Sequence, residues 1–136
     1  MTYLMDTSVW VRAVSKPETL PSDIQKILGS PQQRALSAIS LWEVGKKNQI
    51  GKLELSQPLP TWLTGALPSL VTVLPISVEV VAGAMQLPGF PNRDPADELI
   101  VATARVHDLT LLTTDTALKG YRHARIHYFK PIVIQD

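Results

Sequence analysis

Short apolar runs alternate along the chain with longer segments in which apolar residues recur every three or four positions. The short runs have the length of strands, and several are rich in β-branched residues. They comprise residues 3–5, 34–40, 70–76, 109–114 and a last run within 126–133 that Pro131 interrupts. The pattern therefore predicts five strands.

Helical periodicity fills most of the sequence between these runs. Helices are predicted over residues 9–14, 22–28, 40–49, 61–67, 77–87 and 95–107. Thr7 or Ser8 is a suitable N-cap for the first of them. Ser40 and Glu43 form the S-x-x-E pattern of a capping box, which predicts that the third helix begins at Ser40.

The last predicted helix has the clearest start signal in the chain. Asp94 is a good N-cap, and Pro95 occupies the first helical position, where its missing N–H costs nothing. The inward-facing stripe of this helix is predicted to consist of Leu99, Ala102, Thr103 and Val106.

Strands that alternate with helices imply a mostly parallel central sheet covered on both faces. The predicted fold class is therefore α/β, with three layers in the order α/β/α. A chain of 136 residues is long enough for one real core and short for two, so residues 1–136 are expected to form one domain.

Composition narrows the classes of function. A net charge of +1 provides no general basic field, so any binding of nucleic acid must come from local patches. The absence of cysteine excludes disulfides, thiolate metal sites and cysteine nucleophiles, and it suits a cytoplasmic location. The N-terminal sequence does not read as a signal peptide, and prolines divide the apolar span 63–92 into pieces too short for a membrane helix. No membrane partner is expected.

Four acidic residues occupy equivalent places in this pattern. Asp6 ends the first strand and Asp115 stands just past the fourth, while Glu43 and Asp97 lie near the starts of helices. In open parallel sheets, the carboxyl ends of strands and the starts of the following helices share one edge, where ligands bind. Four acids far apart in sequence are therefore predicted to converge.

Convergence of carboxylates has an energetic consequence. Two carboxylates about 4 Å apart repel each other by roughly 4 kcal/mol at an effective dielectric constant near 20. Protonation could relieve that repulsion, but an all-oxygen cluster is also the site that Mg²⁺ or Mn²⁺ prefers. A metal-ion site is the more economical interpretation, and hydrolysis of phosphodiester bonds is its leading chemistry.

Each acid also has a purely structural explanation. Asp97 and Glu98 suit the first turn of a helix, where the macrodipole favours negative charge, and Glu43 suits a capping box. Asp6 and Asp115 are harder to explain, since Asp is poor strand material, although either could form a turn or cap the next segment. The joint placement of the four acids, and no single one of them, favours a functional site.

Three segments carry a resemblance to a known family. The stretches "LMDTSVW", "SAISLWEVGKKNQIGKLEL" and "RDPADELIVATARVHDLTLLTTD" occur in that order and span most of the chain. With them the chain resembles the PIN-domain nucleases and, within these, the VapC-like toxins of type II toxin–antitoxin systems. The resemblance implies a PIN-like fold and a Mg²⁺- or Mn²⁺-dependent endoribonuclease whose catalytic acids are Asp6, Glu43, Asp97 and Asp115.

The resemblance also implies finer roles. Asp6, Asp97 and Asp115 would be the metal ligands, and Glu43 would complete the shell or orient the attacking water. Thr7 and Thr113 could orient the ligands through hydroxyl hydrogen bonds, although a helix cap and an ordinary strand residue explain them equally well. A cytoplasmic homodimer held inactive by a small antitoxin protein is implied as well. The chain departs from the family at Glu98, where relatives often carry Arg.

Two basic clusters could bind the RNA substrate. One contains Lys46 and Lys47, and the other contains Arg122 and Arg125 among aromatic residues. Phosphate contacts from such clusters give an affinity that depends on salt and tolerates many sequences. A solvated surface is the simpler explanation of any one charge run.

Two other classes of function remain open. A receiver domain that accepts a phosphoryl group is also a small parallel α/β fold with an acidic Mg²⁺ pocket, but Asp6 has no second acid beside it. A PIN-like module that only binds a partner would be expected to lack one of the acids, and none is missing. The chain has no G-x-G-x-x-G, Walker or G-x-S-x-G motif, which weakens nucleotide-binding and serine-hydrolase interpretations.

Overall fold

The computed structural model describes residues 1–91 and 94–134, so Arg93, the first residue of the "RDPADELI" stretch, lies outside the described residues. Within them, the chain forms one sheet of five parallel strands in the order β3-β2-β1-β4-β5. The strands are β1 (Tyr3–Met5), β2 (Arg34–Ser37), β3 (Val71–Leu74), β4 (Thr110–Thr113) and β5 (Ile126–Tyr128). β1 is the central strand, which places the residue that follows it in the middle of the carboxyl edge.

Helices connect these strands and supply the outer layers. They are α1 (Thr7–Ser15), α2 (Ser22–Gly29), α3 (Ala38–Gln49), α4 (Leu59–Gly65), α5 (Val78–Met85) and α6 (Pro95–Val106), with short 3₁₀ turns η1 (Pro17–Thr19) and η2 (Thr116–Leu118). None of the helices in the described part of the chain is both long and apolar enough to span a bilayer.

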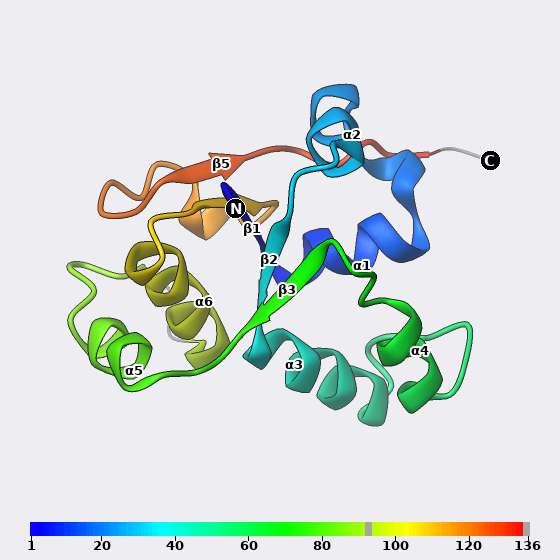
Figure 1. The fold of residues 1–136 in the computed structure, drawn as a ribbon, viewed down its shortest axis with the longest axis horizontal. Coiled ribbons are helices and arrows are strands. Elements are labelled where there is room, and N and C mark those ends of the chain that lie inside the picture. The colour runs from blue at the N-terminus through cyan, green and yellow to red at the C-terminus, as the bar shows by residue number, and fades with distance from the viewer. Residues whose placement is uncertain (92–93, 135–136) are drawn as a thin grey trace.

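Alternation along the strands divides the core between two faces of the sheet. Met5 and Leu112 pack with residues of α1, α2, α3 and α4, whereas the preceding residues, Leu4 and Leu111, pack with α6 on the opposite face. α5 packs on α6. Figure 1 shows α5 and α6 on one side of the strands and α1, α2 and α4 on the other. The predicted three-layer α/β/α architecture is confirmed.

Trp10 anchors the larger of the two packed faces. Its side chain is 1% exposed, and its indole N–H donates to the carbonyl of Ala66 at 2.9 Å. The ring meets Trp62 of α4 edge to face, with centroids 5.3 Å apart. Trp42, by contrast, is 60% exposed on α3. Trp10 therefore belongs to the core, whereas Trp42 contributes little to it.

Two predicted helix caps are wrong. The second strand ends at Ser37, whose hydroxyl caps α3 by accepting from the backbone N–H of Ile39. Ser40 and Glu43 therefore lie inside the helix, and the capping box does not form. At α1 the cap is Asp6, not Thr7 or Ser8. In both places the helix begins directly after the residue that follows or ends the strand, and β2 ends three residues earlier than its apolar run suggests.

The last helix begins as predicted but buries a different face. Asp94 caps α6 through the N–H of Ala96 at 2.9 Å. Val106, expected to face inward, is 41% exposed, and Leu99 is only half-buried. Ile100, Val101 and Ala104, absent from the predicted stripe, are fully buried with Ala102 and Thr103. α6 packs against both the sheet and α5, so its buried face is wider than a single amphipathic stripe.

Candidate active site

Four segments bring the predicted acids to one edge of the sheet. Asp6 follows β1 directly, and Asp115 lies two residues beyond the end of β4. Glu43 lies in the second turn of α3, which begins at the carboxyl end of β2. Asp97 lies in the first turn of α6, and this helix runs back toward the start of β4, so its first turn reaches the same edge. The predicted convergence is present in the fold.

Asp6 is held in place by two donors. The side chain is 6% exposed; its Oδ1 accepts the backbone N–H of Thr7 at 2.8 Å, and its Oδ2 accepts the Thr113 hydroxyl at 2.6 Å. Burial raises the pKa of Asp6 above its ordinary value. The two hydrogen bonds oppose that shift, while the charges of Glu43 and Asp115 add to it. The two hydrogen bonds therefore fix the orientation of the Asp6 carboxyl group, but they do not offset the cost of burying its negative charge.

Glu43 is fixed by a short chain of hydroxyl groups. The Thr7 hydroxyl donates to Glu43 Oε1 at 2.6 Å, and Ser40 Oγ lies 2.7 Å from Thr7 Oγ1. A hydroxyl has one proton, and Thr7 gives its proton to the carboxylate, so Ser40 is the donor to Thr7. The other carboxylate oxygen, Oε2, lies 3.3 Å from Lys47 Nζ. Both oxygens of Glu43 are thus engaged by residues of α1 and α3.

The other acidic side chains at the carboxyl edge act electrostatically on Asp97. Its pKa is raised to about 7, chiefly because the side chain is half-buried. The negative charges of Asp6, Asp94, Asp115 and Glu43 raise it further. Burial and the neighbouring negative charges therefore both favour the protonated form of Asp97.

Thr113 joins two of the acids. Its hydroxyl donates to Asp6 Oδ2 and accepts the backbone N–H of Asp115 at 3.0 Å. Asp115 in turn caps η2 through the N–H of Ala117 at 2.9 Å. One buried hydroxyl at the end of β4 therefore fixes the position of Asp115 relative to Asp6.

Replacement of Thr113 by valine is expected to lower the free energy of unfolding by about 1–3 kcal/mol at pH 8, the cost of leaving a buried acceptor without its donor. Thr113 is 0% exposed, and valine has nearly its shape, so the loss reports the hydroxyl. Urea unfolding in EDTA measures it. Thr110→Val on the same strand is the control, because within the described residues the Thr110 hydroxyl makes no hydrogen bond. Equal losses in the two variants would contradict the assigned role.

The donor set suits a hard divalent cation. It consists of carboxylate oxygens on an edge where neighbouring negative charges contribute to the raised pKa of Asp6 and of Asp97, and such oxygens are what Mg²⁺ and Mn²⁺ prefer. Among residues 1–91 and 94–134, however, no three acidic or histidine side chains are arranged to hold an ion as they stand. Mg²⁺ usually keeps several waters and takes only one or two carboxylates directly, which this looser arrangement accommodates.

The two predicted basic clusters lie near opposite edges of the sheet. Lys47 pairs with Glu43, and Lys46 bonds Gln49 one turn away, so this cluster lies beside the acids. Arg125 precedes β5, and its carbonyl accepts the N–H of Leu111 near the start of β4. Together with Arg122 it lines a depression at the amino edge of the sheet. The structure does not bring these two arginines to the acidic site.

Two residues near the acids have contacts that the sequence did not reveal. Ser40, predicted to be a cap, is fully buried in the hydroxyl chain that reaches Glu43. Asp94 caps α6 as predicted, and its charge also contributes to the raised pKa of Asp97, which the sequence did not reveal. The available signal for Ser40 is its position three residues before an acid on one helix, which places both on the same face once the helix is known to begin earlier.

Comparison with known proteins agrees with this geometry. The model of the PIN domain family matches residues 3–124. Ribonuclease VapC22 of Mycobacterium tuberculosis (strain ATCC 25618 / H37Rv) is 32% identical over 124 residues, which are 91% of this chain and 95% of that protein.

Solved structures show the same fold. VapBC2 from Rickettsia felis bound to a promoter DNA fragment superposes with a TM-score of 0.71 at 20% identity, covering 94% of this chain and 98% of that one. VapC20 of Mycobacterium tuberculosis, a Sarcin-Ricin loop cleaving toxin, gives 0.61 at 14% identity, covering 91% and 99%. Family model, relative and fold agree, and the chain belongs to the PIN domain family.

Proposed function

We propose that this protein is a divalent-metal-dependent endoribonuclease that acts as the toxin of a toxin–antitoxin pair. The observation that carries the proposal is the convergence of four acidic side chains at the carboxyl edge of a parallel sheet, where burial and the neighbouring negative charges together raise the pKa of Asp97 to about 7. The relative that is 32% identical is named a ribonuclease, which supports RNA as the substrate.

An antitoxin partner is supported by the structural neighbours. They include VapBC2 from Rickettsia felis and VapBC from Salmonella typhimurium, each bound to DNA. The proposal for this chain is a small antitoxin that covers the acidic edge and keeps the enzyme inactive. A homodimer in the cytoplasm belongs to the same proposal.

The chain's own residues have distinct parts in the proposed reaction. Asp6, Asp97 and Asp115 would hold Mg²⁺ or Mn²⁺, which when bound would activate water and offset the charge that develops on the phosphoryl oxygens. The hydrogen bonds of Thr113 hold Asp6 and Asp115 in fixed positions relative to each other. Glu43, anchored by Thr7, would orient the attacking water. These hydrogen bonds hold carboxylates in one orientation before substrate arrives, which lowers the cost of reaching the reactive geometry.

The receiver-domain alternative is not favoured. A receiver has the strand order 2-1-3-4-5, in which the first strand lies between the second and third. Here β1 lies between β2 and β4, and the family match is to the PIN domain. A binding module without catalysis shares the fold, so an activity assay must distinguish it from the proposed enzyme.

The decisive experiment measures cleavage of end-labelled RNAs, structured and single-stranded, in Mg²⁺, in Mn²⁺ and in EDTA. Wild type is expected to cut with either metal and not in EDTA. Asp6→Asn should lose cutting, whereas the matched variant Asp23→Asn, at an exposed position of α2, should keep it. Induced expression in a bacterial host should arrest growth for wild type and not for Asp6→Asn. Cutting that is equal in wild type and Asp6→Asn, or absent from every RNA, would contradict the enzyme.

A further inference from the structure

Two depressions meet around the second half of α1. One lies between α1 and the α3 side of the molecule and begins at Thr7 and Ser8, beside the acidic edge. The other lies between α1 and the chain after β5, including Pro131–Ile134. Both are lined by Arg12 and Lys16. The two depressions therefore adjoin at Arg12 and Lys16, and together they are here called the α1 groove.

Positive charge is concentrated along the α1 groove. Its lining includes the cations Arg12, Lys16, Lys47, Lys52 and Lys130, against the two carboxylates Glu18 and Glu54. The whole chain carries a net charge of only +1, so the α1 groove is much more positive than the protein as a whole. Lys47 is paired with Glu43, whereas the other four cations form no ion pair with any described residue.

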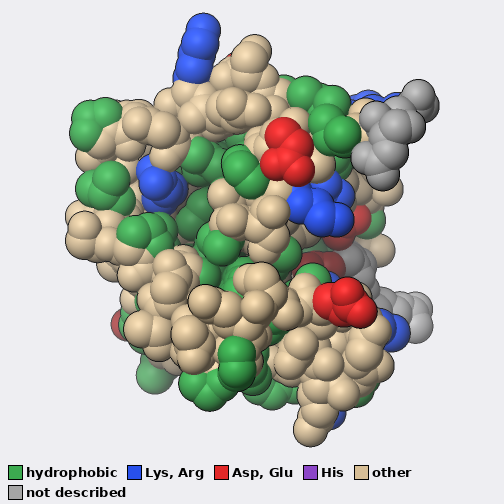
Figure 2. Space-filling view, turned by 90° about the vertical axis from the view of Figure 1, so that its right-hand side faces the viewer, with side chains coloured by type: hydrophobic (Ala, Val, Ile, Leu, Met, Phe, Trp, Pro, Cys, Tyr) green, Lys and Arg blue, Asp and Glu red, His purple; other side chains and the backbone are tan. Residues whose placement is uncertain are grey.

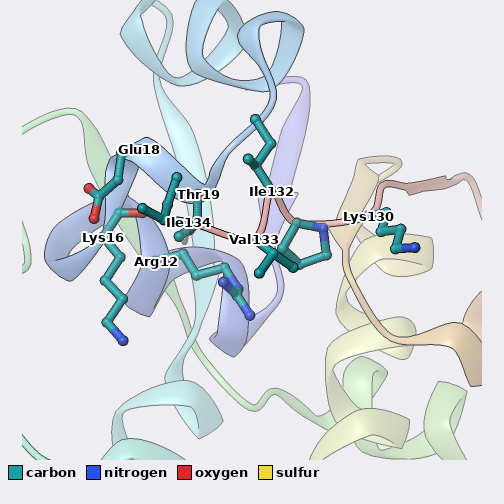
Figure 3. A pocket seen from close by; sticks show the side chains of 9 residues that line it. Arg12, Lys16, Glu18, Thr19, Lys130, Ile132, Val133 and Ile134 are labelled. Carbon is teal, nitrogen blue, oxygen red and sulfur yellow. Dashed lines mark hydrogen bonds between the residues drawn. The ribbon is translucent and has the colours of Figure 1, made fainter. Parts of the chain in front are cut away.

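The cations are spaced along one side of the helix. Ser8 and Arg12 lie four residues apart on α1, and Lys16, the C-cap of this helix, follows after four more, so the three span roughly 12 Å. Figure 3 shows the side chains of Arg12 and Lys16 extending to the same side, while Glu18 lies beyond Lys16, away from Arg12. Lys130 lies on the other side of Arg12 from Lys16, past Val133.

The walls of the α1 groove are partly apolar. Val11, Val44 and Leu53 line the part near the acids, and Ile132 and Ile134 line the far part. Figure 2, which views the molecule from the side that carries α1 and α4, shows hydrophobic side chains around a hollow, with Lys and Arg on both sides of it. Such a surface can accept an apolar base face beside a charged backbone.

We propose that the α1 groove binds the phosphate backbone of single-stranded RNA on one side of the bond to be cut, with Arg12, Lys16 and Lys130 as the phosphate contacts. Continuity with the acidic edge favours this occupant, because a strand whose scissile phosphate lies at the acids must leave along a path that tolerates further phosphates. The inference rests on the proposed function for the position of the scissile bond. Its test does not depend on cleavage.

The test is equilibrium binding of a fluorescein-labelled single-stranded RNA in EDTA, over a series of salt concentrations. Lys16→Gln/Lys130→Gln is the test variant, since both side chains are exposed and the fold should be unaffected. Each lost phosphate contact lowers the slope of log affinity against log salt by about 0.7, so the double variant should lose about 1.4. At 0.1 M salt this corresponds to roughly 10- to 30-fold weaker binding.

A matched control removes two cations elsewhere. Lys26→Gln/Arg105→Gln changes the net charge equally, but it does so on α2 and in the last turn of α6, outside the α1 groove. This control should bind with nearly the wild-type slope. In the cleavage assay, the test variant should raise KM and leave kcat unchanged, because it does not touch the acids.

The outcomes separate the two proposals. An unchanged salt dependence of binding in Lys16→Gln/Lys130→Gln, or an equal loss in the control, would contradict RNA binding in the α1 groove. Neither result would contradict metal-dependent cleavage. A reduced slope confined to the test variant, in a protein that cuts no RNA, would support the groove and contradict the nuclease. A variant that binds RNA normally but fails to bind an acidic partner protein would assign the groove to that partner instead.

Discussion

Replacing Asp97 by asparagine is expected to remove metal-dependent RNA cleavage and, in EDTA, to make the protein more stable at neutral and alkaline pH. Loss of a hydrogen-bond partner behind a metal ligand already costs 10- to 100-fold in affinity or activity, so loss of a ligand should lower kcat/KM by about 100-fold or more. The opposite effect on stability follows from the pKa of Asp97, which is raised to about 7.

The sign of that effect follows from proton binding. Between about pH 4 and pH 7 the folded protein holds a proton on Asp97 that the unfolded chain has lost, so the free energy of unfolding falls as pH rises through this window. The asparagine side chain of the Asp97→Asn variant carries no charge, which removes this dependence. Above pH 7 the variant should be more stable by about 1–2 kcal/mol, a figure reduced for the screening of a half-buried group.

Urea unfolding in EDTA at several pH values between 4 and 8 measures the difference. Wild type and Asp97→Asn should agree near pH 4 and diverge toward pH 8, and Asp23→Asn should follow wild type throughout. Added Mg²⁺ should stabilise wild type more than Asp97→Asn, because a ligand that binds only the folded state stabilises it by mass action. A variant that loses stability at pH 8, or that keeps its cleavage rate, would refute the role given to Asp97.

Replacing Trp10 by alanine should have the largest effect on stability. Trp10 is 1% exposed, and its indole donates to the Ala66 carbonyl and packs on Trp62. Removing such a side chain leaves a cavity and typically costs about 3–5 kcal/mol, a large part of the roughly 5–15 kcal/mol that stabilises an ordinary domain. The midpoint of urea unfolding, followed by far-ultraviolet circular dichroism, should fall accordingly.

Trp42→Ala is the matched control for this prediction. Trp42 is 60% exposed on α3, so its truncation should change the free energy of unfolding by no more than about 0.5 kcal/mol. Trp10→Phe should fall between the two, since it keeps an aromatic ring and loses the hydrogen bond. Comparable losses for Trp10→Ala and Trp42→Ala would show that the pair Trp10–Trp62 does not anchor the core.

The architecture could be predicted because its signals are local. Short apolar runs mark the strands, and Ser77 and Asp94 mark the starts of α5 and α6, where their side chains do accept the N–H groups of Val80 and Ala96. Helix boundaries next to strands could not be predicted in the same way, because a Ser after an apolar run suits both the end of a strand and a cap. Ser37 and Ser40 both fit that description, and the cap is Ser37.

The hydrogen bonds within the candidate site could not be predicted from the sequence pattern. Equivalent positions on parallel strands are enough to expect that Asp6 and Asp115 meet. That Thr113 bridges them, and that Ser40 reaches Glu43 through Thr7, depends on side-chain directions across residues far apart in the chain. The position of Arg122 and Arg125 at the far edge follows from the direction of β5, which is known only once that strand is placed in the sheet.

The pairing of β1 with β4 has a consequence for biosynthesis. Asp6 leaves the ribosome 107 residues before Thr113, whose hydroxyl holds it in the folded protein. A nascent chain that has not reached β4 has neither the strand beside β1 nor Asp115, so its acidic edge is incomplete. The proposed RNA-cleaving site can therefore assemble only after the ribosome has synthesised β4.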